Sequence, residues 1–368
     1  MRVLLIAGSY PPEPCGVGDY ASQLSQALAA EPGTEVAVLA RGRPVDPGMA
    51  GLTLLPPVRA WVFRELPAII RRTRGWRPDV VHIQYPTHGF FDKRLPLLLP
   101  LGQLLPLVLR LAGLRVVATL HEPPPRGITL LHFLMPLLGA SGLIFVRPQF
   151  LDNFGTRLRR LLERLPLVTI PNAANLPVSG LSGEQSKALR ARLLQGQSRL
   201  VVFFGFMARH KGVERLFEIA DPDTDRLVIA GGSNDDAYHR ELQALADGPR
   251  WHGKVSFTGF APPAEAADLL AAADAVVLPF LSGGGSWNTS IHSALAQGSF
   301  VLTTGQPASG DDPVRNLYTA PPAGLAEMRE ALRHHAGRRV APAQGQSPWK
   351  AIAQAHLAHY ARCLGRPV

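Results

Sequence analysis

Short apolar runs alternate with segments of helical periodicity along the chain, and this alternation constrains the fold more than any other feature. The runs occupy residues 2–7, 35–40, 80–84, 116–122, 143–147 and 167–172 in the first half, and 199–204, 226–232, 255–260, 275–280 and 300–304 in the second. Runs that are apolar on both faces are typical of parallel strands covered by helices. The alternation therefore predicts an α/β protein with two parallel, doubly wound sheets.

The length of the chain indicates more than one domain. It has 368 residues, of which 46% are hydrophobic, and single cores rarely grow beyond roughly 250–300 residues. The turn-rich segment NAANLPVSG separates the two sets of strands. We expect a Rossmann-like N-terminal domain at 1–174, a Rossmann-like second domain at 175–346, and an amphipathic C-terminal helix at 347–368 that crosses back to the first domain.

Cysteines and carboxylates give no pattern for a metal site or a disulfide framework. Cys15 and Cys363 are the only cysteines and lack metal-ligand spacing,. Asp221, Asp223 and Asp225 resemble a metal-binding cluster, but they lie in a turn between strands, so we expect solvated turn residues and no metal. The first apolar run ends in polar turn residues, which predicts a first strand rather than a signal peptide and favours a cytoplasmic protein.

The basic charge of the chain is concentrated in its first half. The net charge is +10, and residues 1–175 contain 19 Lys/Arg against 11 Asp/Glu. Arginines cluster on a helical pattern at 64–77, either as a solvated basic face or as a contact for acidic lipid headgroups at the inner face of the cytoplasmic membrane. Nucleic acid is not expected as a partner, because no zinc-finger, RNP-like or helix-turn-helix pattern accompanies the charge.

The most apolar window, residues 95–114, has two interpretations. It contains three prolines, two glycines and Arg110, which disfavours a membrane-spanning helix. A core helix with an exposed apolar shoulder is the default, and a monotopic membrane contact is the alternative.

A glycine-rich turn at 282–288 runs directly into a helical pattern and then into the strand at 300–304. Such a turn can direct backbone N–H groups to one point, and the start of the helix adds the positive end of the peptide dipole, so the junction suits a phosphate. Asn288, Thr289 and Ser290 stand where helix N-caps stand. The alternative is an ordinary loop that caps an ordinary helix.

Three other strand ends carry polar groups. Lys211 follows the strand at 199–204 in a strand–loop–helix junction, beside Arg209 and His210, and can contact a diphosphate while Gly205 and Gly212 let backbone approach,. Gly16 and Gly18 follow the first strand in a glycine loop, but lack the third glycine of the dinucleotide fingerprint. The strand at 116–122 ends in His121 and Glu122, where open α/β sheets bind ligands. A surface lysine and a structural histidine are the alternatives.

Nine segments in register resemble a family 4 glycosyltransferase of the GT-B fold over nearly the whole chain. They are PPEPCGVGDYASQLSQAL (11–28), PDVVHIQY (78–85), ATLHE (118–122), IPNAAN (170–175), FFGFMARHKGVERL (203–216), LVIAGG (227–232), VSFTGF (255–260), AADAVVLPF (272–280) and SALAQGSFVLTT (293–304). The resemblance implies two Rossmann-like domains facing a central cleft and a retaining transfer of a sugar. The nucleotide-sugar donor is the cosubstrate, no other cofactor or metal is implied, and the acceptor is a glycan or lipid-linked molecule of cell-surface polysaccharide synthesis.

The resemblance also implies roles for individual residues. The donor diphosphate would contact Gly16, Gly18, Arg209, Lys211, Thr289, Ser290 and Ile291. His121 would be the catalytic contact near the donor sugar, through hydrogen bonding rather than as a nucleophile. The donor sugar and nucleotide would lie against Gly205, Gly232, Phe260, Gly285, Ser286, Asn288 and Ser293, and the acceptor side would include Asp19, Tyr20, Gln84 and Tyr85.

Two departures from the family pattern keep a second hypothesis open. The family usually has two glutamates eight positions apart in this last loop, and Gly285 and Ser293 stand in their places. The arginine that usually follows the glycine at 205 is Phe206, although Arg209 lies in the same loop. The alternative to a transferase is a catalytically degenerate protein that binds a nucleotide sugar or acts as a scaffold in glycan assembly.

Overall fold

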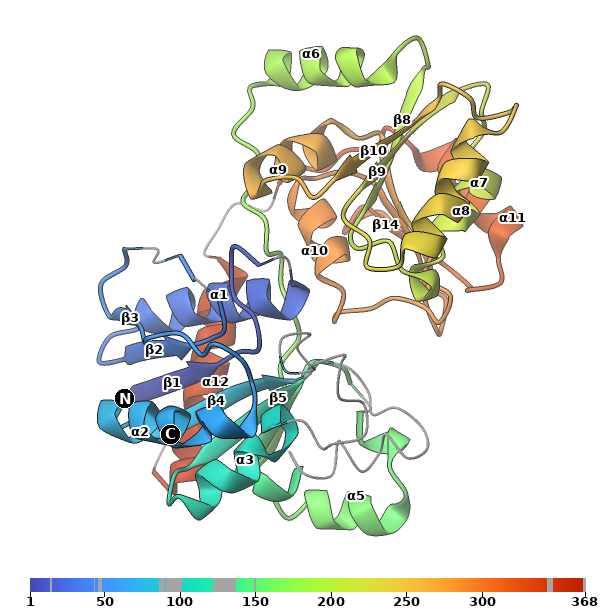
Figure 1. The fold of residues 1–368 in the computed structure, drawn as a ribbon. Coiled ribbons are helices and arrows are strands. Elements are labelled where there is room, and N and C mark those ends of the chain that lie inside the picture. The colour runs from blue at the N-terminus through green and yellow to red at the C-terminus, as the bar shows by residue number, and fades with distance from the viewer. Residues whose placement is uncertain are drawn as a thin grey trace. The chain divides into compact units, whose positions relative to one another are not determined.

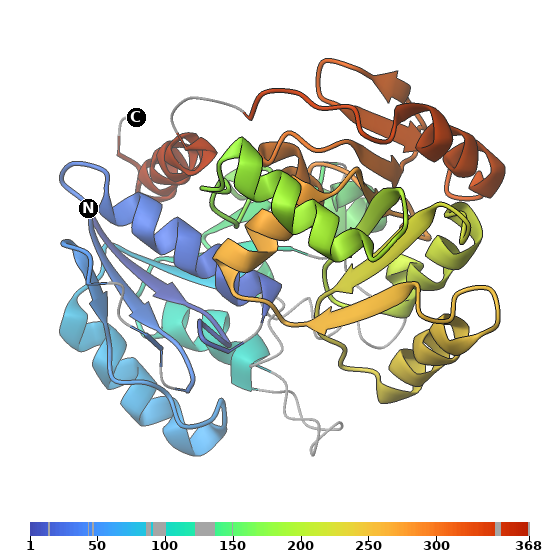
Figure 2. The same ribbon diagram turned by 90° about the horizontal axis from the view of Figure 1, so that it is seen from above.

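The computed structural model describes residues 1–13, 15–42, 44–45, 48–85, 90, 101–121, 137–148, 150–342 and 347–366. The chain divides into two compact units, Met1–Asn172 with Gln346–Val368, and Ala173–Gly345. Each unit contains a seven-stranded sheet with helices on both faces (Figure 1; Figure 2). The predicted α/β class with two doubly wound sheets is confirmed.

The sheet of the first unit has the order β3-β2-β1-β4-β5-β6-β7 and is parallel throughout. Its strands are β1 (Arg2–Ile6), β2 (Glu35–Leu39), β3 (Leu52–Leu54), β4 (Val80–Tyr85), β5 (Val116–Leu120), β6 (Gly142–Phe145) and β7 (Leu167–Thr169). Its helices are α1 (Gly16–Ala29), α2 (Leu66–Trp76), α3 (Leu101–Leu111), α5 (Thr156–Leu162) and α12 (Pro348–Leu364), with short 3₁₀ turns η1 (Phe63–Glu65) and η4 (Phe150–Asn153).

The side chains of the first sheet point alternately to two faces, and different helices cover each face. Alternate residues of β4, such as Val81 and Ile83, enter a core with α2 and α3, because successive side chains of a strand point to opposite faces. The other face carries α1 and α12, which contact each other (Figure 1). The C-terminal helix therefore belongs to the first unit, although the whole second unit precedes it in the sequence.

The sheet of the second unit has the order β10-β9-β8-β11-β12-β14-β13. Its strands are β8 (Arg199–Phe204), β9 (Asp225–Ala230), β10 (Val255–Gly259), β11 (Ala275–Leu278), β12 (Val301–Thr304), β13 (Gly310–Asp312) and β14 (Leu317–Ala320). Its helices are α6 (Gly183–Leu194), α7 (Leu216–Ile219), α8 (Asp236–Asp247), α9 (Pro263–Ala272), α10 (Thr289–Ala296) and α11 (Leu325–His335), with η5 (Arg209–Lys211) and η6 (Val213–Arg215). Helices α6, α9 and α10 cover one face, and α7, α8 and α11 cover the other (Figure 1).

The structure corrects three expectations. Helix α1 begins at Gly16, so Gly16 and Gly18 form its first turn rather than a loop before it. Strands β13 and β14 extend the second sheet, and β13 is antiparallel. Asp225 is fully buried, and its carboxylate accepts two hydrogen bonds from Arg199, at 2.6 and 2.8 Å. The expectation of solvated turn residues is therefore wrong for Asp225, because a neighbouring strand supplies a guanidinium that compensates the charge.

Candidate functional site

Lys211 lies directly above the backbone that follows β8. Gly205 has φ +136°, and a Cβ added there would lie 3.0 Å from the Lys211 Nζ atom. Gly212 has φ +64°, and a Cβ there would lie 2.5 Å from the carbonyl oxygen of Pro279. Both positions therefore require glycine for the backbone conformation, and Gly212 requires it also because of the close approach to the Pro279 carbonyl,. The ammonium group therefore lies at the carboxyl end of β8.

The glycine-rich loop after β11 is joined to the Lys211 loop. The N–H of Leu281 donates to the carbonyl of His210 at 3.0 Å, and the N–H of Gly284 donates to that of Thr304 at 2.7 Å. Strands β8 and β11 are neighbours in the sheet, so both loops leave the same edge. The cation and the start of α10 consequently belong to one region of the second unit.

Helix α10 begins at Thr289, with Asn288 as its N-cap residue. The prediction of a helix start at Asn288, Thr289 and Ser290 is confirmed. The Asn288 side chain does not cap the helix, because its Oδ1 accepts a hydrogen bond from the Gly285 N–H at 2.9 Å. Within the ranges that the structure describes, no acceptor binds the N–H groups of Thr289 or Ser290. These amides and the helix dipole can therefore bind an anion.

Trp287 occupies the space beside Gly285. A Cβ at Gly285 would lie 2.3 Å from the indole ring of Trp287, and heavy atoms in contact normally stay more than 3 Å apart. The structure thus explains why no carboxylate stands at 285, which is a relationship that sequence spacing alone could not show.

His292 is a residue of this loop that sequence reasoning did not identify. Its Nε2–H donates to the carbonyl of Ser286 at 3.0 Å, and burial lowers its pKa, an effect to which Arg315 adds. The neutral imidazole therefore fixes the backbone of the loop at Ser286. The only signal in the sequence is the position of this histidine in the first turn of α10, four residues after Asn288.

Ser293 is fully buried and holds the segment that enters the second unit. Its hydroxyl donates to the Asn175 Oδ1 atom at 2.9 Å and accepts from the Asn175 N–H at 3.4 Å. One turn later, the Gln297 side chain donates to the Pro177 carbonyl at 2.8 Å. The structure therefore places Ser293 against the chain rather than at an open surface.

Arg209 is directed to helix α8. Its guanidinium donates to both carboxylate oxygens of Glu241, at 2.9 and 2.6 Å, and lies 3.6 Å from the Asp235 carboxylate. It also lies over the Tyr238 ring at 4.9 Å. The charge of Arg209 is thus compensated within its own unit.

Two other predicted donor residues lie at the ends of neighbouring strands. A Cβ at Gly232, after β9, would make an ordinary contact of 3.7 Å with the Phe206 ring. Phe260, directly after β10, leaves 57% of its surface exposed. An exposed aromatic ring at the carboxyl edge of a sheet can stack on a base.

The first turn of α1 packs against the end of β1 in the first unit. A Cβ at Gly18 would lie 3.0 Å from the Ser9 carbonyl oxygen, whereas nothing lies within 4 Å of a Cβ at Gly16. Asp19 is half-buried in the same turn, and burial raises its pKa to about 6. Gly18 therefore serves the packing of the helix, and Gly16 leaves open space at its N-terminus.

His121 stands immediately after β5 in a buried polar cluster. Its Nε2 atom lies 2.8 Å from the Gln84 Oε1 atom, and its ring meets the Tyr20 ring edge-on, with centroids 4.7 Å apart. Burial lowers the pKa of His121 to about 3. The side chain is therefore neutral at physiological pH. The structure brings three of the predicted residues together here: Tyr20, Gln84 and His121.

Tyr85 lies on the opposite face of β4 from Gln84. It is buried in the core that includes Phe90, and the centroids of the two rings are 5.3 Å apart. Glu122, which follows His121 in the sequence and was expected at the same strand end, lies outside the described residues.

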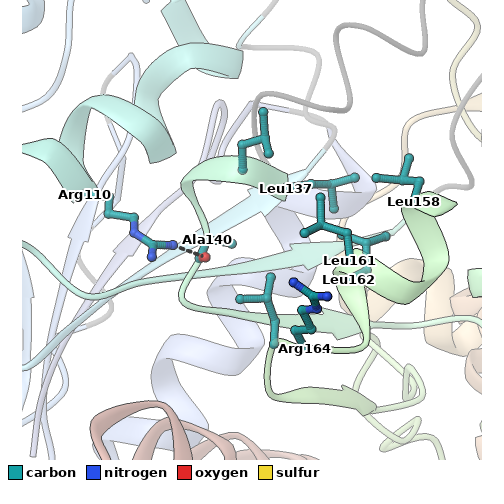
Figure 3. Close-up of a pocket in the computed structure, with 9 residues that line it drawn as sticks. Arg110, Leu137, Ala140, Leu158, Leu161, Leu162 and Arg164 are labelled. Carbon is teal, nitrogen blue, oxygen red and sulfur yellow. Dashed lines mark hydrogen bonds between the residues drawn. The ribbon is translucent and has the colours of Figure 1, made fainter.

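An apolar pocket of about 150 Å³ opens in the first unit, away from these strand ends (Figure 3). Leucines of α5 and of residues 137–138 line it, with Arg110 and Arg164 beside them. The Arg110 guanidinium donates to the Ala140 carbonyl at 2.7 Å. Leu111, Leu138 and Leu161 are 80%, 50% and 46% exposed. Helix α3, which lies in the described part of the predicted apolar window, thus ends in an exposed leucine; residues 95–100 lie outside the described ranges.

Within the described ranges, the helices are too short or too polar for any of them to cross a bilayer.

Two Rossmann-like units in one chain, each with polar groups at the carboxyl ends of its strands, define a protein of the GT-B class. Solved structures with this fold cover the whole chain. Sucrose-phosphate synthase from Thermosynechococcus elongatus matches with a TM-score of 0.68 and 18% identity, covering 99% of each chain. HepE from Anabaena in complex with UDP and glucose matches with 0.66 and 14%, covering 99% of this chain and 97% of that one.

The catalytic domain of starch synthase IV from Arabidopsis thaliana, bound to ADP and acarbose, matches with a TM-score of 0.65 and 15% identity over 100% of both chains. A search of curated proteins finds no match. The family profile "Glycosyltransferase Family 4" matches residues 14–176, and "Glycosyl transferases group 1" matches residues 198–335. Together the two profiles span most of the chain, and the chain belongs to the family 4-like glycosyltransferases.

Proposed function

We propose that the protein is a retaining glycosyltransferase that moves a sugar from a nucleotide diphosphate donor to a glycan or lipid-linked acceptor in cell-surface polysaccharide synthesis. The observation that carries the proposal is the position of the Lys211 ammonium over Gly205, in the loop that is bonded to the loop before α10. Negative charge grows on the leaving diphosphate during transfer, and fixed cationic and N–H groups stabilise it best when they are preorganised.

Lys211 and the N–H groups of Thr289 and Ser290 would bind the diphosphate, whereas the Ile291 N–H already donates to the Asn288 carbonyl at 3.1 Å. A lysine supplies a full positive charge. The start of the helix supplies N–H groups that donate hydrogen bonds to the phosphate oxygens, together with the partial positive charge of the helix dipole. This pair of features can stabilise the leaving group without a divalent cation, so we propose metal-independent transfer. Gly16, with open space at its Cβ position, would let phosphate approach the start of α1.

His121 would contact the sugar as a neutral hydrogen-bonding group. Its burial and its low pKa disfavour a charged imidazolium,. The retaining outcome rests on the resemblance to family 4. Phe260 would stack on the base, and the region of Asp19 and Tyr20 would face the acceptor.

Donor identity is best tested with a defined panel. HepE has been solved with UDP-glucose and with UDP, and starch synthase IV with ADP, so UDP- and ADP-sugars come first, followed by GDP-sugars. We expect donor consumption in the presence of lipid extracts or glycan acceptors, with retention at the anomeric carbon. No turnover of any donor, with or without acceptor, would contradict the transferase.

A second candidate function follows from Gly285 and Ser293. Trp287 excludes a side chain at 285, and the Ser293 hydroxyl is bonded to Asn175, so neither position presents a carboxylate to a sugar. A protein that binds the nucleotide sugar without turnover would fit this arrangement. Calorimetry that detects nucleotide binding in a preparation without transfer activity would favour it.

We further propose that the first unit meets an anionic membrane surface from the cytoplasmic side. Exposed leucines beside Arg110 and Arg164 (Figure 3) combine apolar area with positive charge, which is the combination that holds a peripheral protein to acidic lipids. Such a position would give the enzyme access to a lipid-linked acceptor.

A further inference from the structure

A row of buried polar side chains connects His121 to the C-terminal helix. Residues His82 and Gln84 alternate with the core residues of β4, and Thr119 and His121 alternate in the same way along β5. Gln84 and Thr119 are partners in the register of the two strands. Because side chains two apart share a face, all four meet on the face of the sheet that α12 covers.

The hydrogen bonds in this row fix the position of each proton. The Gln84 side-chain amide nitrogen lies 3.1 Å from the His82 Nε2 atom and 3.5 Å from Nδ1, so with this orientation of the amide the nearer ring nitrogen, Nε2, is the acceptor. With Nε2 unprotonated, the Thr119 hydroxyl, at 2.7 Å, donates to the same atom and shares its lone pair with the amide. A neutral His82 then carries its proton on Nδ1, which lies 2.6 Å from the Tyr360 hydroxyl and donates to it.

The other end of the Gln84 amide determines the state of His121. The Gln84 Oε1 atom can only accept, and it lies 2.8 Å from the His121 Nε2 atom, so Nε2 must carry the proton. In the neutral ring, Nδ1 is then left with a lone pair. An amide that donates at one end and accepts at the other thus couples the tautomers of the two histidines.

Helix α12 contributes to the same face through residues one turn apart. His356 donates from Nδ1 to the Ile352 carbonyl at 2.7 Å, so its Nε2 accepts from the Tyr20 hydroxyl at 3.4 Å. His82, Gln84, Thr119, His356 and Tyr360 have essentially no exposed surface. Because water does not reach this cluster, a proton arrangement that breaks one of its hydrogen bonds leaves a buried polar group without a partner, which is destabilising.

We propose that Tyr360, His82 and Gln84 are positioning residues that hold His121 as the Nε2-protonated tautomer, leaving Nδ1 to accept a hydrogen bond from a hydroxyl of the bound sugar. The tautomer follows from the orientation of the Gln84 amide, and only the contact with a sugar rests on the proposed function. His121 is the single member of the row placed at the strand end. The others act through it.

The relay predicts that a distant hydroxyl changes the tautomer of His121. In Tyr360→Phe, the His82 Nδ1–H loses its acceptor, so its proton is favoured on Nε2 instead. The Gln84 amide then turns its oxygen to His82 and its nitrogen to His121, which moves the His121 proton to Nδ1. Gln84→Leu removes the coupling directly and gives a mixture of His121 tautomers.

Nitrogen-15 NMR of histidine-labelled full-length protein tests this, with the His121 signals assigned by their loss in His121→Asn. We expect a protonated Nε2 and an unprotonated Nδ1 in the wild type, reversal in Tyr360→Phe, and a mixture in Gln84→Leu. Tyr10→Phe is the matched control: Tyr10 is equally buried, and its hydroxyl bonds Ser25 at 2.9 Å outside the row. It should leave the His121 signals unchanged.

A wild-type His121 protonated on Nδ1, or a tautomer that neither variant changes, would overturn the relay. These results need no turnover, so they separate the relay from the transferase. In a preparation that transfers sugar, Tyr360→Phe should lower kcat roughly three- to ten-fold, the effect of one net hydrogen bond, with the Kd of the nucleotide diphosphate unchanged. An intact relay without transfer in any assay would refute the proposed function alone.

Discussion

The Nζ atom of Lys211 lies 3.0 Å from the position that a Cβ at Gly205 would occupy. The backbone at the end of β8 therefore sets the position available to the cation. The positive φ of Gly205 turns the backbone, and the absence of a side chain leaves room for the Lys211 ammonium group,. Gly212 closes the same loop in the left-handed conformation. In the proposed function, a diphosphate at this strand end would meet the Lys211 charge beside the Gly205 backbone.

Lys211→Ala should weaken the binding of nucleotide diphosphates while leaving the fold intact. Losing a charge-assisted contact costs about 1.5–3 kcal/mol, which corresponds to roughly a 10- to 150-fold increase in Kd. Calorimetry with UDP and ADP measures the effect. Lys254→Ala is the control, because Lys254 is a surface lysine of the same unit whose nearest carboxylate, on Asp223, lies 3.9 Å away. Equal affinities of the two variants would remove Lys211 from the site.

Gly285→Glu should not restore the glutamate of the family pattern. The new Cβ would meet the Trp287 ring, and overpacking of this kind costs about 1–3 kcal/mol. Adding Trp287→Ala to Gly285→Glu should recover much of that loss, because the two substitutions act on one contact. Urea unfolding of the two single variants and the double variant gives the coupling energy. Additive effects would show that the ring does not exclude a side chain at 285.

The strands and the start of α10 could be predicted from the sequence because local signals decided them. Strands buried on both faces are apolar at almost every position, as in Leu200–Phe203, and a turn residue such as Asn288 commonly precedes a helix. His121 was correctly expected at the end of its strand for the same reason. Each of these features depends on a few consecutive residues.

The features that were missed depend on contacts between distant residues. Helix α1 begins at Gly16 because Gly18 can pack against Ser9 without a Cβ, which the glycine spacing does not reveal. Strand β13 is only three residues long, Gly-Asp-Asp, and has no hydrophobic pattern of its own. The bond between His82 and Tyr360 joins positions 278 apart in sequence, so only the folded chain shows that α12 takes part in placing His121.

The buried histidines predict a loss of stability in mild acid. Burial lowers the folded-state pKa of His356 to about 4, below its ordinary value of 6.5. Because the folded-state pKa is the lower one, the stabilising contribution is complete above pH 6.5 and is lost as the pH falls toward 4. Between pH 7 and pH 5 this amounts to at most about 2 kcal/mol for one such group. Urea unfolding across that range measures it.

His356→Gln should reduce the pH dependence of the free energy of unfolding by one proton, whatever its effect on absolute stability. His252→Gln is the control, since His252 is exposed in the second unit, and it should keep the wild-type slope. A His356→Gln slope equal to that of the wild type would show that this histidine is not held neutral in the folded protein.

The first unit exposes Leu138 and Leu161 beside Arg110 and Arg164. This surface predicts selective binding to acidic lipids. The protein should float with vesicles that contain phosphatidylglycerol and stay unbound with purely zwitterionic vesicles, increasingly so as salt is lowered. Arg164→Gln should weaken this binding about five-fold, because one basic residue at a membrane surface contributes about 1 kcal/mol. Arg192→Gln removes an exposed arginine of α6 in the other unit and should leave flotation unchanged. Equal binding to both kinds of vesicle, or equal losses of binding in the two variants, would contradict the proposed contact between this surface and acidic lipids.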